Sequence, residues 1–113
     1  MQTNTQAALA YKAAAVHRSI RSQEADVFRR ATGALKAAQD AGPVARVRAL
    51  ADNRRLWTAV QDIVRAPENT LPEQLRASIV SVSLAVHREM DRDSPDLGFL
   101  ISINEHFAAG LSD

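Results

Sequence analysis

The chain has no cysteine, and only 4% of its 113 residues are aromatic. Without cysteine it can form neither a disulfide framework nor a thiolate metal site, which is typical of a reducing compartment, so the cytoplasm is the expected location. Apolar residues make up 46% of the chain, and alanine is abundant among them. Because alanine favours helix and strand-forming aromatics are scarce, the composition predicts an all-α protein.

The chain also lacks a strong charge of either sign and any long apolar run. Its formal net charge is +1, and its arginines are spread from Arg18 to Arg92. Such a dispersed charge creates no strong field for nucleic acid or an anionic membrane, which argues against direct RNA binding. Lys12 interrupts the N-terminal alanine run, so no segment approaches the length of a signal peptide or a membrane span, and no membrane contact is expected.

Motifs for catalysis are missing as well. His17, His87 and His106 are far apart in the sequence and fit no metal-binding spacing, and there is no glycine-rich phosphate loop. No nucleophile stands beside a base in a diagnostic pattern. We therefore expect no enzyme activity, no cofactor and no metal site.

Helical spacing of apolar residues and the positions of helix breakers predict a compact bundle of four main helices, plus an N-terminal helix or arm over residues 1–21. Residues 22–113 form one helical domain in this interpretation. The four helices are expected at about 23–41, 44–66, 71–90 and 95–111. Their expected core stripes include Val27 in the first and Leu75 in the third.

Local signals suggest where these helices begin and pack. Thr70 and Glu73 have the spacing of a capping box, and Ser94 followed by Pro95 resembles an N-cap with proline at the first helical position. Gly33 and Gly98 lie inside helical patterns, where close packing between helices would explain them.

The segment "DNRRLW", residues 52–57, combines an amide, two arginines and the only tryptophan. On a helix, Asn53 and Trp57 lie on the apolar face, so Trp57 is interpreted as a core anchor rather than a ligand-binding residue. Arg54 flanks that face and Arg55 points almost oppositely, and both are interpreted as a solvated rim or as partner contacts. Asn104 has the same central place in the last helix, so both amides are expected to be buried and hydrogen-bonded, either to each other or at a backbone break.

The third and fourth helices carry more apolar surface than one core contact needs. Val80 and Leu84 lie beside the main stripe of the third helix, and Phe99 and Ile103 form an i,i+4 pair on the fourth. Either these helices are packed on two sides, or the four side chains belong to an exposed groove for a partner.

Four segments resemble the flagellar biosynthesis regulator FlaF family. They are "EADVFRRATGAL", "ALADNRRLWTAVQDIV", "NTLPEQLRASIVSVS" and "LISINEHFAAGL", in this order. The resemblance implies a non-enzymatic cytoplasmic factor required for flagellin production and secretion, acting alongside the flagellin-translation regulator FlbT and binding flagellin itself.

Two functions are compatible with this resemblance. The first is a chaperone-like protein that holds flagellin in an apolar helical groove, with Val80, Leu84, Phe99 and Ile103 as contacts and Arg54 and Arg55 as the rim. The second is a post-transcriptional regulator that acts on flagellin mRNA directly or through FlbT. The absence of an RNA-binding motif and of a clustered basic stripe favours the first.

Overall fold

The structure, a computed structural model, describes residues 7–8 and 25–112, the last two of these through their backbone only. Apart from residues 7–8, which are helical, the expected N-terminal helix lies outside the described residues. Every long element within residues 25–112 is an α-helix, and the four helices pack as a compact bundle. The predicted all-α fold is therefore confirmed.

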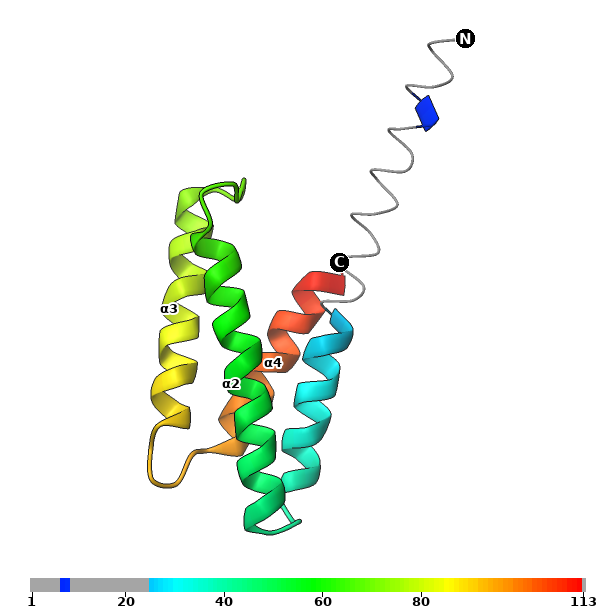
Figure 1. Cartoon of the computed structure of the whole chain (residues 1–113), viewed down its shortest axis with the longest axis vertical. Helices are drawn as coiled ribbons and strands as arrows, with labels where there is room; N and C mark the ends of the chain where they lie inside the picture. The colour runs from blue at the N-terminus through cyan, green and yellow to red at the C-terminus, as the bar shows by residue number, and fades with distance from the viewer. Residues whose placement is uncertain (1–6, 9–24, 113) are drawn as a thin grey trace.

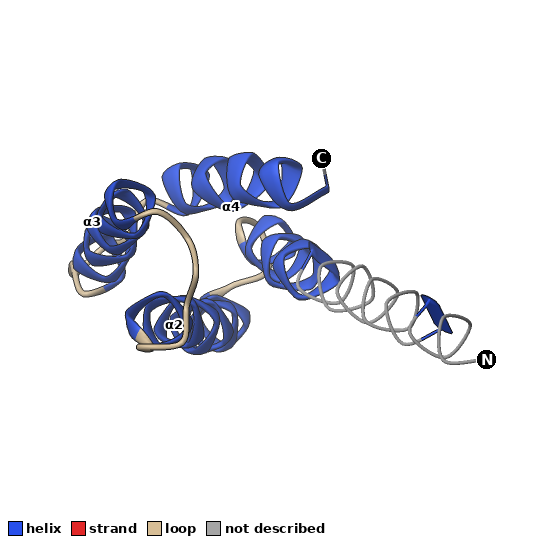
Figure 2. Ribbon diagram, turned by 90° about the horizontal axis from the view of Figure 1, so that it is seen from above, coloured by secondary structure: helices blue, strands red, loops and turns tan. Residues whose placement is uncertain are grey.

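The four helices alternate in direction. A helix over residues 25–38, called here the 25–38 helix, is followed by α2 (Pro43–Arg65), α3 (Glu73–Met90) and α4 (Leu97–Ser112). In Figure 1, α2 and α4 run upward, while the 25–38 helix and α3 run downward. Seen from above, α2 lies between α3 and the 25–38 helix (Figure 2). In the same view α4 lies on the side of the bundle opposite α2.

The breaks around α2 follow from glycine and proline. Gly42 provides the N-cap of α2 with a φ of 90°, a left-handed conformation that glycine adopts without strain. Pro43 then occupies the first turn, where its missing N–H costs nothing. At the other end, Ala66 is extended because Pro67 follows it.

The predicted capping box at the start of α3 is wrong. Pro72 is the N-cap, so Glu73 is the first helical residue and stands too early to fold back onto Thr70. Neither side chain caps the helix. Asn69 stabilises the turn instead, because its side-chain oxygen accepts the backbone N–H of Leu71 at 2.9 Å.

The predicted start of α4 is also wrong by two residues. Ser94 and Pro95 precede the helix, which begins at Leu97. Asp96 caps it, since its carboxylate accepts the backbone N–H of Phe99 at 3.1 Å. An acidic cap at this end also complements the helix dipole.

Two residues predicted for the core lie on the surface. Val27 is 46% exposed, and Phe28, at 2%, takes its place among the buried residues. Leu75 is 47% exposed although it is on the core-facing stripe of α3. The upper end of the α2–α3 hairpin projects past the other two helices in Figure 1, so no described helix covers this turn.

Close packing between helices, predicted for Gly33 and Gly98, explains neither of them. A Cβ added at Gly33 would meet nothing within 4 Å. At Gly98 the nearest atom would be Asp96 Oδ1 at 3.3 Å, within the cap of the same helix. The absence of a side chain at Gly98 therefore leaves room for the capping carboxylate.

Candidate interaction surface

Asn53 and Trp57 belong to a chain of buried hydrogen bonds that joins three helices. The indole N–H of Trp57 donates to Asn104 Oδ1 at 2.9 Å, and Asn104 Nδ2 donates to Asn53 Oδ1 at 2.7 Å. Asn53 Nδ2 in turn lies 3.4 Å from Met90 Sδ, a weak acceptor. Trp57 and both amides have 0% exposure. The predicted burial and hydrogen bonding of the two asparagines are confirmed, and of the two alternatives for their partners the structure shows that they bond each other.

Trp57 is also the centre of an aromatic cluster. Its ring meets Phe28 of the 25–38 helix at a centroid distance of 5.7 Å and Phe107 of α4 at 5.1 Å, both edge to face. Phe28 and Phe107 stack on each other at 5.2 Å. Such contacts stabilise the core beyond the burial of area alone. Trp57 is therefore a core anchor, and no face of its ring is open to a ligand.

Two residues that contact Trp57, Phe28 and Ser83, were not predicted from the sequence. Phe28 could have been found, because Phe28, Ala31, Leu35 and Ala38 repeat at helical spacing just as well as the stripe that begins at Val27. Ser83 carried no signal: it is a small polar residue inside α3, fully buried, and its hydroxyl donates to the Trp57 carbonyl oxygen at 3.4 Å. Only the packing of α3 on α2 gives it this role.

Arg54 and Arg55 are adjacent in sequence but turn to different sides of α2. Arg54 reaches Asp91, the C-cap of α3, at 2.9 Å. Arg55 lies 3.6 Å from Asp52 of its own helix, and 83% of its side chain is exposed. The two arginines therefore do not form one rim, and only Arg54 lies beside α3.

The four predicted partner contacts on α3 and α4 differ in exposure. Leu84 is 45% exposed and Phe99 is 39% exposed, so both present apolar surface to solvent. Val80 is half-buried. Ile103 is half-buried too and packs against the core cluster, which gives it a structural role.

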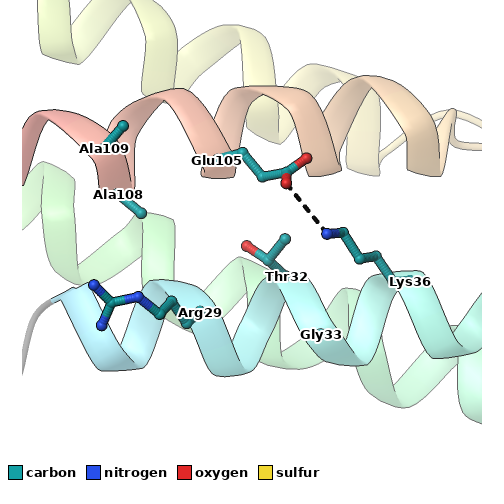
Figure 3. A pocket seen from close by; sticks show the side chains of 7 residues that line it. All are labelled: Arg29, Thr32, Gly33, Lys36, Glu105, Ala108 and Ala109. Atoms are coloured by element: carbon teal, nitrogen blue, oxygen red, sulfur yellow. Dashed lines mark hydrogen bonds and ion pairs between the residues drawn. The ribbon is translucent and has the colours of Figure 1, made fainter.

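A groove of about 410 Å³ separates the 25–38 helix from α4. Small residues line it, among them Gly33, Ala108 and Ala109, and Figure 3 shows how Lys36 and Glu105 approach each other across it. Lys36 Nζ lies 3.2 Å from Glu105 Oε2, with both side chains 53% exposed. An ion pair that is this exposed is screened by water and contributes little to the stability of the fold.

A second groove, of about 360 Å³, lies between the 25–38 helix and α2. Four apolar and three charged residues line it: Val27, Ala31, Leu56 and Ala59, with Arg30, Asp52 and Arg55. Arg55, predicted as a partner contact, therefore belongs to this groove.

Within residues 7–8 and 25–112, no cluster of histidine and acidic side chains could hold a metal ion. None of the helices in this part of the chain combines the length and the apolar character needed to cross a bilayer. The described surface offers two grooves and several exposed apolar side chains.

The model of the family described as flagellar protein FlaF matches residues 7–111. The chain belongs to the FlaF family. The match includes the buried pair Asn53 and Asn104, both grooves and the exposed side chains of α3 and α4. A search of curated proteins and a search of solved structures find no match. Family membership makes this FlaF protein a flagellar one, and the resemblance noted in its sequence is confirmed.

Proposed function

We propose that this FlaF protein is a cytoplasmic flagellar biosynthesis factor that binds flagellin and, in the manner of a chaperone, supports its production and secretion. Membership of the flagellar family supports the cellular process. The observation that carries the binding role is the exposed apolar surface of α3 and α4, where Leu84 and Phe99 are 45% and 39% exposed.

The side chains of Leu84 and Phe99 point away from the core of the bundle. The buried stripe of α3 includes Ser83, Val86 and Met90, and Leu84 lies on the opposite side of that helix. In α4, Leu100 and Asn104 are buried, and Phe99 lies on a different side of the helix from both. Neither side chain is needed for the core, so a partner can cover both without unfolding the bundle.

An amphipathic segment of flagellin could lay its apolar side chains over this surface and become ordered there. Ordering such a segment costs about 2–5 kcal/mol, while micromolar affinity requires a net free energy of about −8 kcal/mol. The contact must therefore bury substantial apolar area. Val80 would extend it along α3, and Ile103 would support it from beneath.

Purified flagellin monomer and purified FlaF protein provide the direct test. The double variant Leu84→Ser with Phe99→Ser should weaken binding about tenfold or more, since each change removes a buried apolar contact worth roughly 1–2 kcal/mol. Val44→Ser with Val47→Ser is the matched control, because these valines are 67% and 65% exposed on α2. Circular dichroism should report unchanged helicity for both variants.

Salt dependence separates this function from the RNA alternative. Apolar binding should change little between low and moderate salt, whereas binding to RNA phosphates should fall steeply. Protein that ignores flagellin and binds flagellin mRNA in a salt-sensitive manner would refute the proposal and support a post-transcriptional regulator, acting alone or through FlbT.

A further inference from the structure

The groove between the 25–38 helix and α2 has an apolar lining that runs from the core to the surface. The two helices are antiparallel, so Val27 and Ala59 lie toward the same end and line the groove together. Val27 is 46% exposed, while Ala31 and Leu56 beneath are 7% and 9% exposed. The exposed valine therefore continues the core outward to the surface.

The apolar strip extends along α2 beyond the groove itself. Ile63 is one helical turn after Ala59 on the same side of α2, and it is 53% exposed. From Asp52 to Ile63 the helix rises about 16 Å, or three turns. This length suits a helical segment lying along α2 and the 25–38 helix as a third helix.

Two arginines flank the strip and are available to a partner. No carboxylate of the described residues pairs with Arg30. Arg55 has only Asp52, at 3.6 Å and with both side chains largely exposed, so that pair is weak. Arginine forks bind carboxylates in preference to other protein groups.

We infer that this groove is a second docking site, which binds an amphipathic helix of another protein with an apolar face and acidic flanks. The apolar face would cover Val27 and Ala59, and its carboxylates would meet Arg30 and Arg55. The N-terminal segment of this chain has the wrong charge for this role, because residues 1–23 contain Lys12, Arg18 and Arg21 and no acid.

The site goes beyond flagellin binding, because it lies on another side of the molecule. In Figure 2 the pair formed by α2 and the 25–38 helix is on the side opposite the corner where α3 meets α4. A helix in the groove would leave Leu84 and Phe99 accessible. The protein can then hold two partners at once, as an adaptor does.

Two synthetic peptides test the inference on the full-length protein. Both are designed helices of about 18 residues with the same leucine face, and they differ only in having glutamate or lysine along its flanks. The protein should bind the glutamate peptide about tenfold more tightly, by fluorescence anisotropy at low salt. The double variant Arg30→Glu with Arg55→Glu should reverse this preference, and Arg65→Glu with Arg88→Glu, elsewhere on the surface, should not.

The apolar floor is tested separately. Val27→Asp should weaken binding of the glutamate peptide about tenfold or more, while Val47→Asp, at a valine 65% exposed outside the groove, should not. If Val27→Asp fails to fold, the charge reversal still decides the matter.

Equal binding of both peptides, no binding of either, or indifference to the charge reversal overturns the inference. So does a dimer, seen by light scattering without peptide and abolished by Val27→Asp, which would make a second copy the occupant. An RNA oligonucleotide bound through Arg30 and Arg55 would overturn it as well. None of these results depends on whether flagellin binds at α3 and α4.

Discussion

Asn53 and Arg55 are two positions apart on α2, yet they belong to regions built on opposite principles. Asn53 has 0% exposure and hydrogen bonds within a core that contains four polar residues. Arg55 has 83% of its side chain exposed, above a groove lined by Val27 and Leu56. The core thus buries polar groups, while the surface leaves apolar ones uncovered.

The core and the groove differ because their residues have different neighbours. In the core, α4 places Asn104 opposite Asn53, so both amides obtain partners and their burial is tolerated. At the groove, no described helix lies over Val27, so its apolar surface stays in water. A satisfied polar core specifies one arrangement of the helices, whereas an uncovered apolar strip allows a further partner.

The largest loss should follow from breaking the core at its centre. Trp57→Ala should lower the free energy of unfolding by about 3–5 kcal/mol, because it removes the aromatic contacts and leaves a cavity. Chemical denaturation followed by circular dichroism measures this. Phe99→Ala, at an aromatic residue 39% exposed, is the control and should cost clearly less. Similar losses in the two variants would contradict the assignment of Trp57 as the anchor.

The next effect concerns the amide pair. Asn53→Leu and Asn104→Leu should each lower the free energy of unfolding by about 1–3 kcal/mol, because each leaves buried groups without partners. Asn104→Leu should cost more, since it deprives both Asn53 and the indole N–H of Trp57. In a double-mutant cycle the combined loss should be smaller than the sum of the single losses. Additive losses would mean that the amides do not stabilise each other.

The smallest effect should come from the groove. Val27→Ser and Arg55→Ala should each change the free energy of unfolding by no more than about 0.5 kcal/mol, as is usual for exposed positions. Thermal and urea unfolding would detect a larger change in the free energy of unfolding. A loss near that of Phe28→Ala, roughly 3–5 kcal/mol, would show that these groove residues belong to the core.

The helices were predictable from the sequence to within a few residues, and the ends of α2 were predicted better than the starts of α3 and α4. Gly42 and the Ala66–Pro67 step fix the limits of α2 through local backbone geometry, which is written in the sequence. Asp96 and Ser94 are both good N-cap residues, and Pro95 made Ser94 look the better one. The choice depends on how the chain leaves α3 and on where Leu97 enters the core.

Partner surfaces were harder to predict than the core. The spacing of Asn53 and Trp57 placed both on a buried face, and the structure agrees. Helical spacing separates Arg54 from Arg55, but only the structure shows that Arg54 meets Asp91 and that Arg55 lines the groove beside the 25–38 helix. The groove at Val27 was hidden by the same ambiguity, because two neighbouring stripes of that helix are apolar.

The sequence by itself determined that the chain is helical, which segments form its four main helices, that it belongs to the FlaF family and that Asn53, Trp57 and Asn104 face inward. These properties follow from propensities, periodicity and motifs that act within a few turns of helix. The tertiary structure alone decided that the two amides bond each other, that Phe28 rather than Val27 is buried, and that Arg54 meets Asp91 while Arg55 lines a groove. Each of these depends on a neighbour brought from a distant part of the chain, and one residue of rotation about a helix axis moves a side chain by 100°.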